Sequence, residues 1–388
     1  MERTQLKYGC NPHQAYAAIE ALANGASPVA IRNGRPSMIN LLDALNAWQL
    51  VSELRAALEL PAAASFKHVS PAGAAVAVEL PSDLQQAYEV TGRRLTPLAT
   101  AYVRARGADP KCSFGDFVAL SDRVDVATAS FLKGVVSDGV IAPGFEEEAF
   151  QILAAKKSGG FIVIEADPGF EPPEREEREV FGLKLVQDRN NRKVSLADLD
   201  DVVCGSLSDE ARRDLVLGLV TLKYTQSNSV GYALGGQMIG IGAGQQSRVD
   251  CTRLAGQKAD TWHLGRHAKV LGLRFKQGVK RQDRINWRVR FIEGDLTPSE
   301  EQQLVEALDE PLELLSADEK QAWVAKLDGV ALVSDGFIPF RDNIEQAQQH
   351  GVRFIAQPGG STRDKDIEAA CREYGIAMAH TDLRLFHH

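Results

Sequence analysis

A lysine and a histidine stand side by side in the stretch SFKHVSPAG, residues 65–73. An apolar run leads into the pair and Ser-Pro-Ala-Gly follows it, which predicts a strand that ends in a turn. Adjacent strand residues point to opposite faces, so Lys67 and His68 can share a pocket only if the backbone leaves strand geometry between Phe66 and Pro71. A nearby ammonium group would keep His68 neutral and able to accept a proton. Taken alone, the dipeptide favours the simpler interpretation, a snorkelling lysine beside a hydrogen-bonded histidine.

A glycine-rich stretch, GQMIGIGAGQQSRVDCTRLAG, has glycines at 240, 242 and 244 between a strand-like run and a helix-like run. The third glycine of a dinucleotide fingerprint would fall at Gln245, and the chain has no G-K-[ST] for a P-loop. The remaining prediction is a strand-to-helix turn with free backbone N–H groups and Arg248 in the first helical turn. Such a turn can hold an anion or an amide, or can be a tight connection only.

Three further segments carry groups that could line a site: KYTQSNS, FIPFRDN and the final LRLFHH. The run KYTQSNS, residues 223–229, is almost entirely polar and includes Asn228. It is either a solvated loop or a ligand-facing shelf, and its apolar flanks favour the shelf. In FIPFRDN, Asp342 or Asn343 could cap the next helix, or Phe337 and Phe340 around Pro339 could form an apolar slot for a flat ring with a polar rim.

The final residues, LRLFHH, are too apolar for a frayed end. We expect Leu383, Leu385 and Phe386 to anchor this end in the core, which would fix Arg384 and His388 in place.

Several other chemistries lack their motifs. A zinc deaminase needs H-x-E and P-C-x-x-C, a serine hydrolase G-x-S-x-G and a metalloprotease H-E-x-x-H, and none of these occurs in the chain. The five cysteines are far apart and never form C-x-x-C, which argues against a disulfide framework or a zinc ribbon. What remains is acid–base chemistry without a metal site, or simple binding.

Composition places the chain among ordinary globular proteins. It has 388 residues, 44% hydrophobic and 25% charged, with a formal net charge of −8, which argues against a general nucleic-acid binder. The N-terminus lacks the apolar core of a signal peptide, and no run reaches the length of a membrane span. We therefore expect a cytoplasmic protein with no membrane partner.

Strand-like and helix-like segments alternate, which predicts an α/β fold. Residues 231–242 indicate a hairpin around two central glycines, and 206–220 an amphipathic helix. Residues 169–182 are rich in Pro, Glu and Arg and predict an exposed linker. We expect two units, 1–172 and 173–388. Residues 265–327 should form a mainly helical insertion in the second unit that packs with the first.

These stretches together resemble one family. The segments YGCNPHQ, SFKHVSPAGAAVA, SFGDFVALSD, VSDGVIAPGF, LKYTQSNSV, IGIGAGQQSRVDCTRLAG, FIPFRDN and HTDLRLFHH look like the AICAR transformylase domain of the bifunctional purine-synthesis enzyme. They occur in the family's order and span residues 6–388. The IMP cyclohydrolase domain that normally precedes this domain is not in the chain, so we expect a stand-alone or an excised transformylase.

The resemblance implies two cytidine-deaminase-like α/β units without the zinc site, and a homodimer whose active sites lie at the interface. It implies formyl transfer from 10-formyltetrahydrofolate, the co-substrate, to the 5-amino group of 5-aminoimidazole-4-carboxamide ribonucleotide (AICAR). The products would be FAICAR and tetrahydrofolate, on the route to IMP. It implies no catalytic metal, and a structural potassium ion near the Asn228 loop.

Site residues follow from the resemblance by position. Lys67, His68 and Asn228 match the catalytic residues. The positions expected to hold the nucleotide are Lys7, Tyr8, Gly115, Asp138, Arg248, Arg384, Phe386 and His388, and those on the folate side are Phe337, Pro339, Phe340, Asp342 and Asn343. The family usually has Arg where this chain has Lys7, and a lysine keeps the charge but loses the bidentate grip on phosphate.

Three other functions fit parts of the same pattern. A nucleotide- or folate-binding regulator would bind both ligands without turnover. A deaminase acting on a nucleotide base would share the implied fold, but its zinc ligands are missing from the sequence. The chain could also be a fragment of a bifunctional enzyme.

Overall fold

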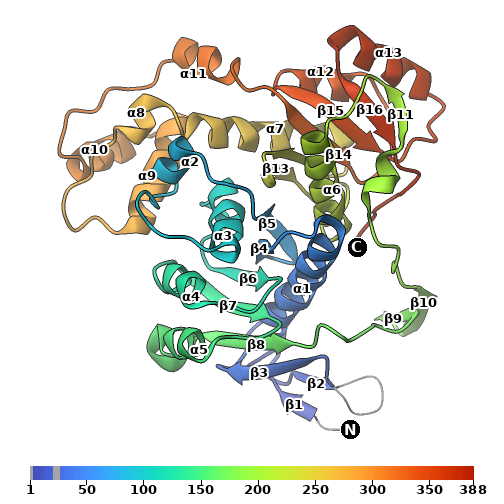
Figure 1. Cartoon of the computed structure of the whole chain (residues 1–388). Helices are drawn as coiled ribbons and strands as arrows, with labels where there is room; N and C mark the ends of the chain where they lie inside the picture. Colours follow the sequence, from blue (N-terminus) through green and yellow to red (C-terminus); the bar gives the residue numbers. More distant parts are fainter. Residues whose placement is uncertain (1–2, 21–26) are drawn as a thin grey trace.

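The computed structural model describes residues 3–20 and 27–388 (Figure 1). In this part of the chain a twelve-stranded mixed sheet runs in the order β11-β16-β15-β14-β12-β13-β5-β4-β6-β7-β8-β3. Its strands are β3 (Val29–Asn33), β4 (Ala62–Lys67), β5 (Ser70–Val76), β6 (Asp116–Leu120), β7 (Ser137–Ala142), β8 (Ile162–Ala166), β11 (Asp201–Cys204), β12 (Val230–Leu234), β13 (Gln237–Gly242), β14 (Val330–Ser334), β15 (Val352–Gln357) and β16 (Ala377–His380). A small separate pair, β1 (Arg3–Gln5) and β2 (Ala18–Glu20), lies near the N-terminus.

Helices follow most of the strands. They are α1 (Met38–Leu58), α2 (Ser82–Ala87), α3 (Pro97–Ala108), α4 (Val126–Lys133), α5 (Glu147–Ala154), α6 (Asp209–Lys223), α7 (Arg248–Leu264), α8 (Ala268–Leu271), α9 (Arg281–Glu293), α10 (Pro298–Ala307), α11 (Ala317–Val324), α12 (Asp342–Gln348) and α13 (Asp364–Tyr374). The expected α/β fold is therefore confirmed. The helix predicted over 206–220 is α6, which begins after Ser208, whose side chain accepts a hydrogen bond from the Ala211 amide.

The two halves of the sheet repeat one topology. In the first half, β5-β4 and β4-β6 are antiparallel, β6-β7 and β7-β8 are parallel, and β8-β3 is antiparallel. In the second half, β13-β12, β12-β14, β14-β15, β15-β16 and β16-β11 follow the same sequence of directions. Helices α1 and α6 take equivalent places after the first strand of each half, and α3 and α7 follow each hairpin.

Alternating strand residues divide the core between the two faces of the sheet. In β6, Val118 and Leu120 belong to one buried cluster, whereas Phe117 and Ala119 belong to the other. Helices α3, α4, α5, α7, α12 and α13 contribute to the first cluster, and α1 and α6 contribute to the second. Because both faces are covered, the central strands are continuously apolar, as the short runs in the sequence predicted.

A buried ion pair joins the halves where α1 and α6 meet. Lys223 Nζ lies 2.8 Å from Glu53 Oε2, and both side chains are almost fully buried. Glu53 also accepts hydrogen bonds from the Tyr224 hydroxyl and the Val194 amide, at 2.8 and 2.9 Å. Strands β13 and β5 also meet here, with Gln237 opposite Ala75. Removing one partner of such a pair leaves an uncompensated buried charge, which typically costs about 3–5 kcal/mol.

Helices α8 to α11 lie between α7 and β14 and extend over the first half, beside α2 (Figure 1). Three arginines of α9 converge on one carboxylate of the first half: Arg281, Arg284 and Arg288 all lie within 3.4 Å of Glu89. This cluster lowers the pKa of Glu89 to about 2, since the arginine hydrogen bonds and charges outweigh the opposing effect of burial. A small buried cluster around Phe291 and Leu304 holds these helices to one another.

The segment predicted as a linker is exposed, but it is not irregular. Strands β9 (Arg175–Val180) and β10 (Leu183–Asp188) form an antiparallel ribbon that stands away from the central sheet (Figure 1). Its two turn residues, Phe181 and Gly182, both have positive φ, 47° and 79°, as a two-residue hairpin turn requires. The charge-rich composition predicted a linker. In the structure, charged side chains of the two strands form ion pairs such as Lys184–Glu177 across the ribbon. No helix of the described residues is long and apolar enough to cross a membrane.

Candidate active site

The tip of the β4–β5 hairpin carries Lys67 and His68. Strand β4 ends at Lys67, and Ser70 of β5 lies opposite it. His68 and Val69 form the turn with φ values of 55° and 59°, a left-handed conformation that is uncommon for non-glycine residues and rare for a β-branched one. The ladder also shifts register between Ser65 and Phe66. The backbone therefore leaves strand geometry in the region that the sequence predicted, and His68 is exposed at the tip.

Lys67 reaches toward the loop that precedes β6. Its Nζ donates a hydrogen bond to the Phe114 carbonyl oxygen at 2.6 Å. The next residue, Gly115, has a φ of 74°, and its amide donates to the Val136 carbonyl at 3.1 Å. The structure thus brings two predicted site residues, Lys67 and Gly115, next to each other.

Asp43 supports the hairpin tip from α1, and the sequence analysis missed it. This carboxylate is buried, and its Oδ1 accepts a hydrogen bond from the Val69 amide at 2.6 Å. Burial raises the pKa of Asp43 from its ordinary 3.8 to about 6, although the Val69 amide and the nearby His68 and Lys67 oppose the shift. An acidic residue within the mostly apolar stretch INLLDALNAW was the signal available in the sequence.

A cavity of about 590 Å³ contains three more of the predicted residues: Lys7, Tyr8 and Asp138. Asp138 pairs there with Lys157, 2.7 Å away. The other residues that line the cavity are Cys10, Pro12, Arg35, Ser37, Ile39, Asn40, Gly160 and Ile162. These residues, together with Lys67, His68 and Gly115, form what we call the first-half cluster.

Arg248 organises a second group of predicted residues. It is nearly buried, and its Nη2 donates to Asn228 Oδ1 at 2.8 Å, whereas its Nη1 binds Ser334 Oγ and the buried carboxylate of Asp335. Asn228 Nδ2 in turn lies within hydrogen-bond distance of the Gln245 and Gln246 carbonyls, at 3.1 and 3.3 Å. The polar shelf and the glycine-rich turn therefore form one hydrogen-bonded unit that holds the Asn228 amide in a fixed orientation.

The C-terminal segment joins this unit through its backbone. Leu385 donates its amide to the Asp335 carbonyl at 2.8 Å, and Ser227 donates its amide to the His387 carbonyl at 3.0 Å. Leu385 is buried, as predicted, but Phe386 is 41% exposed. The expectation that Phe386 anchors the end in the core was wrong, because the extended backbone that buries Leu385 turns its neighbours outward.

Gly336 leaves room for Phe386 and Arg248 where they approach the end of β14. A side chain at Gly336 would meet Arg248 Nη2 at 2.7 Å and the Phe386 ring at 2.9 Å. The guanidinium of Arg384 lies 4.9 Å from the Phe386 ring centroid. His388 stacks edge-on against the same ring, and its carbonyl accepts a hydrogen bond from Arg178.

Phe337 and Phe340 are 47% and 55% exposed, on either side of half-buried Pro339. Helix α12 begins at Asp342, so Asp342 and Asn343 are its first residues, and neither is its N-cap, which was the other expectation for them. Asn343 is buried, and it accepts a hydrogen bond from Thr252 at 3.1 Å. Its amide nitrogen also donates to the Phe340 carbonyl oxygen at 3.3 Å, so Asn343 helps to fix the Phe337–Phe340 segment. The Asn228, Arg248, Arg384, Phe386, His388 and Phe337–Asn343 positions form the second-half cluster.

The two clusters are neighbours without direct bonds. Among the described residues, no hydrogen bond or ion pair joins a predicted site residue of the first-half cluster to one of the second-half cluster. The nearest link is a 3.5 Å hydrogen bond from the Gln226 amide to Ser70 Oγ, which holds the polar shelf against the hairpin tip.

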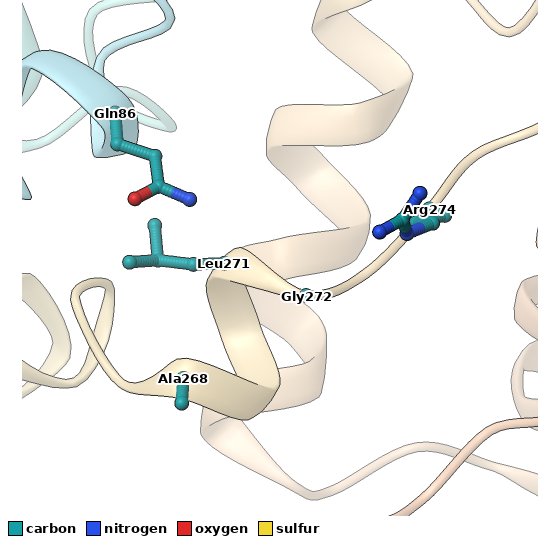
Figure 2. Close-up of a pocket in the computed structure, with 5 residues that line it drawn as sticks. All are labelled: Gln86, Ala268, Leu271, Gly272 and Arg274. Atoms are coloured by element: carbon teal, nitrogen blue, oxygen red, sulfur yellow. The ribbon is translucent and has the colours of Figure 1, made fainter.

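A second cavity, of about 530 Å³, lies at α8 (Figure 2). It is lined by Gln86 and by Ala268, Leu271, Gly272 and Arg274. Arg274 pairs with Glu310, and none of the predicted site residues lines this cavity. Within residues 3–20 and 27–388, no three His, Cys, Asp or Glu side chains are grouped so that they could hold a metal ion.

The arrangement defines a protein that can bind small anionic molecules with flat rings. Cations and a nearly buried arginine suit anions, exposed phenylalanines suit a ring, and the exposed imidazole of His68 can move a proton. Arg248 and Lys67 are held by hydrogen bonds to neighbouring segments, and positioning of two reactants requires such fixed groups.

The family model of the AICARFT/IMPCHase bienzyme matches residues 1–258. The bifunctional purine biosynthesis protein PurH of Cereibacter sphaeroides is 32% identical over 386 residues. Its counterpart in Roseobacter denitrificans is 31% identical over 388 residues. Both alignments cover 99% of this chain and 59% of the relative, so the chain spans about three fifths of the length of these curated relatives. The chain belongs to the AICARFT/IMPCHase bienzyme family.

Replacing Asp43 by Asn should remove a pH dependence of stability. The raised pKa means that folded Asp43 holds its proton more tightly than unfolded Asp43, so its contribution to stability falls as pH rises from about 4 to about 6. The carboxamide that replaces the carboxyl group stays neutral and can still accept the Val69 amide. We expect the free energy of unfolding of Asp43→Asn, relative to wild type, to rise by up to about 3 kcal/mol between pH 4 and pH 7.

Denaturant unfolding followed by circular dichroism at several pH values measures this difference. Asp167→Asn, at an exposed position of the same half, controls for the substitution itself. Parallel pH curves for wild type and Asp43→Asn would show that Asp43 is not the group responsible.

Proposed function

We propose that this chain transfers the formyl group of 10-formyltetrahydrofolate to the 5-amino group of AICAR, giving FAICAR and tetrahydrofolate. The observation that carries the proposal is the position of Lys67 and His68 at a hairpin tip outside strand geometry, in a chain of this family. Both relatives are named as purine biosynthesis proteins.

The substrate amine is a weak nucleophile because its lone pair is delocalised into the ring and the carboxamide. In the proposed mechanism His68 takes the amine proton as nitrogen attacks the formyl carbon. As the bond between the formyl carbon and the folate N10 breaks, N10 takes this proton from His68 to give tetrahydrofolate, and Lys67 stabilises the charge that develops. The hydrogen bond from Lys67 to the Phe114 carbonyl sets its position. Asn228, held by Arg248, orients His68 or the formyl oxygen.

The other predicted residues divide between the two substrates. In the proposed complex Lys7, Tyr8, Gly115, Asp138, Arg248, Arg384, Phe386 and His388 hold AICAR, and Phe337, Pro339, Phe340, Asp342 and Asn343 form the folate side. The exposure of both phenylalanines supports the folate assignment, since a flat pteridine ring would cover them. Buried Asn343 would act by holding Phe340 and Asp342, with which its amide is hydrogen-bonded.

The activity is tested by mixing the protein with AICAR and 10-formyltetrahydrofolate and following tetrahydrofolate by absorbance. We expect turnover by wild type, and a kcat lower by about 10²–10⁴-fold in His68→Ala, the range for loss of a general base. Lys67→Gln should also lose turnover. His267→Ala, in the helical insertion, is the matched control. Full turnover by His68→Ala would remove it from this role, and binding of both substrates without any product would make the chain a binding protein.

We further propose that residues 1–172 and 173–388 are two cytidine-deaminase-like units. The identical order and direction of strands in the two halves supports this division. A cytoplasmic location is supported by the free state of all five cysteines.

We propose a homodimer whose active sites combine both clusters across the interface. Support comes from the exposed aromatic side chains of the second-half cluster and from the β9–β10 ribbon. The ribbon exposes five apolar side chains: Val180, Phe181, Leu183, Leu185 and Val186. Phe181 is fully exposed, and such a concentration of apolar surface typically marks a protein interface.

Sedimentation velocity tests the role of the ribbon. Wild type should sediment as a dimer, and Phe181→Asp combined with Leu185→Asp should shift it toward monomer with a roughly tenfold or greater loss of association. Leu314→Asp, an exposed leucine of the helical insertion, is the control. A double variant that dimerises like wild type would place the interface elsewhere.

We propose a structural potassium ion beside the Asn228 loop. The Ser229 hydroxyl is buried and has no hydrogen-bond partner. The amide of the same residue donates to the Asp335 carboxylate, which also accepts from Ser227 Oγ. Clustered oxygen atoms of this kind can replace the hydration shell of potassium. The ion would hold the loop in place and take no part in proton transfer.

Exchange of buffer cations tests the ion. Potassium should raise Tm above its value in tetramethylammonium or lithium buffer at equal ionic strength, because it binds the folded state. Ser229→Ala should remove the rise, whereas Ser52→Ala, which removes another unpartnered hydroxyl, should keep it. The same Tm in every cation would contradict the assignment.

A further inference from the structure

Two cations in the first-half cavity have no ionic partner. Lys7 and Arg35 both line the cavity, and among the described residues no carboxylate lies within ion-pair distance of either. The third cation, Lys157, is neutralised by Asp138. With Asp138 as the single carboxylate among the lining residues, the cavity carries a surplus of about two positive charges.

Backbone hydrogen bonds bring together the two segments that carry these cations. The Lys7 amide donates to the Pro36 carbonyl at 3.0 Å, and the Met38 amide donates to the Tyr8 carbonyl at 3.1 Å. Residues 7–8 therefore run along residues 36–38, which Arg35 directly precedes, and both cations line the same cavity. The first turn of α1 lines the same cavity through Ser37, Ile39 and Asn40, and the N-terminal end of this helix adds partial positive charge.

We propose that Arg35 is a specificity-determining residue that, with Lys7, binds the 5′-phosphate of the ribonucleotide substrate. The inference rests on the function proposed above. A phosphomonoester carries nearly two negative charges at neutral pH, which matches the charge surplus. Arg35 presents a planar fork that can bind two phosphate oxygens at once, whereas the Lys7 ammonium acts as a point charge. Arg35 thus supplies the bidentate grip that a lysine at position 7 cannot provide.

The folate co-substrate is also an anion, through its glutamyl carboxylates, but the cavity favours the nucleotide. Tyr8 and Asp138 line the same space, where they can meet a base and a ribose, and the exposed phenylalanines that suit a pteridine belong to the second-half cluster. If the cavity binds the nucleotide phosphate, removing that phosphate from AICAR should weaken binding and remove the effect of Arg35. If the cavity binds folate, removing it should change neither.

Calorimetric titration of the full-length protein with AICAR and with its riboside, which lacks the phosphate, tests the proposal. Wild type should bind the ribonucleotide more tightly. Arg35→Met should weaken ribonucleotide binding by roughly 10- to 100-fold, as expected for loss of a hydrogen-bonded charge pair, and leave riboside binding unchanged. Arg35→Lys should recover part of the loss, and Lys7→Arg should recover part of it in the Arg35→Met background.

Arg94→Met removes an exposed arginine outside the cavity and should behave as wild type, and Tm of every variant checks folding. An Arg35→Met protein that keeps the wild-type preference for the ribonucleotide, or that weakens both ligands equally, would overturn the proposal. The titrations measure binding and need no turnover. Failure to form tetrahydrofolate would therefore refute the proposed activity without deciding whether Arg35 binds the phosphate.

Discussion

The buried carboxylate of Asp335 is the contact on which the second-half cluster depends. It stands at the end of β14 and binds Arg248 from α7, together with the Ser227 hydroxyl and the Ser229 amide from the polar shelf. Its backbone carbonyl also holds the C-terminal segment through Leu385. A charge buried this deeply is tolerated only with its partners present. Three segments distant in sequence therefore take their positions from one residue. These segments carry Asn228, Arg384 and Phe386.

The repeated topology gives the two halves equivalent hairpins with different chemistry. In the second half the turn between β12 and β13 is Gly235-Gly236, and both residues have positive φ at little steric cost. In the first half the same turn is His68-Val69, which adopts a similar backbone without glycine. The unfavourable conformation is held by Asp43 and by the flanking ladder. Strain of this kind is typically retained where a side chain must be presented, and here it presents the imidazole.

Local sequence patterns were sufficient where the structure is local. Short apolar runs closed by Gly or Pro gave the buried strands β7, β8, β14 and β15, and the paired glycines gave the second hairpin. The break between Phe66 and Pro71 was expected because Lys67 and His68 can share a pocket only outside strand geometry, and the structure places it at His68 and Val69. The pairing of β5 with β13, the hydrogen bond from Val69 to Asp43 and the pairing of residues 7–8 with 36–38 join residues far apart in sequence, so no local pattern predicts these contacts. The ribbon was missed because the Pro, Glu and Arg content of residues 169–182 predicted a linker, and Phe386 because apolar character alone does not fix the side of an extended chain.

The ion pair between Glu53 and Lys223 has a consequence for how the chain reaches its native state. Each half can form most of its own sheet from contacts within itself, and large chains commonly fold in such units before the units associate. Association in any other register would leave an ammonium and a carboxylate buried apart, which is far less favourable than the native pairing. The pair therefore favours one arrangement of the two similar halves during assembly. Apolar surfaces alone would discriminate less, because many alignments of the halves would bury a similar area.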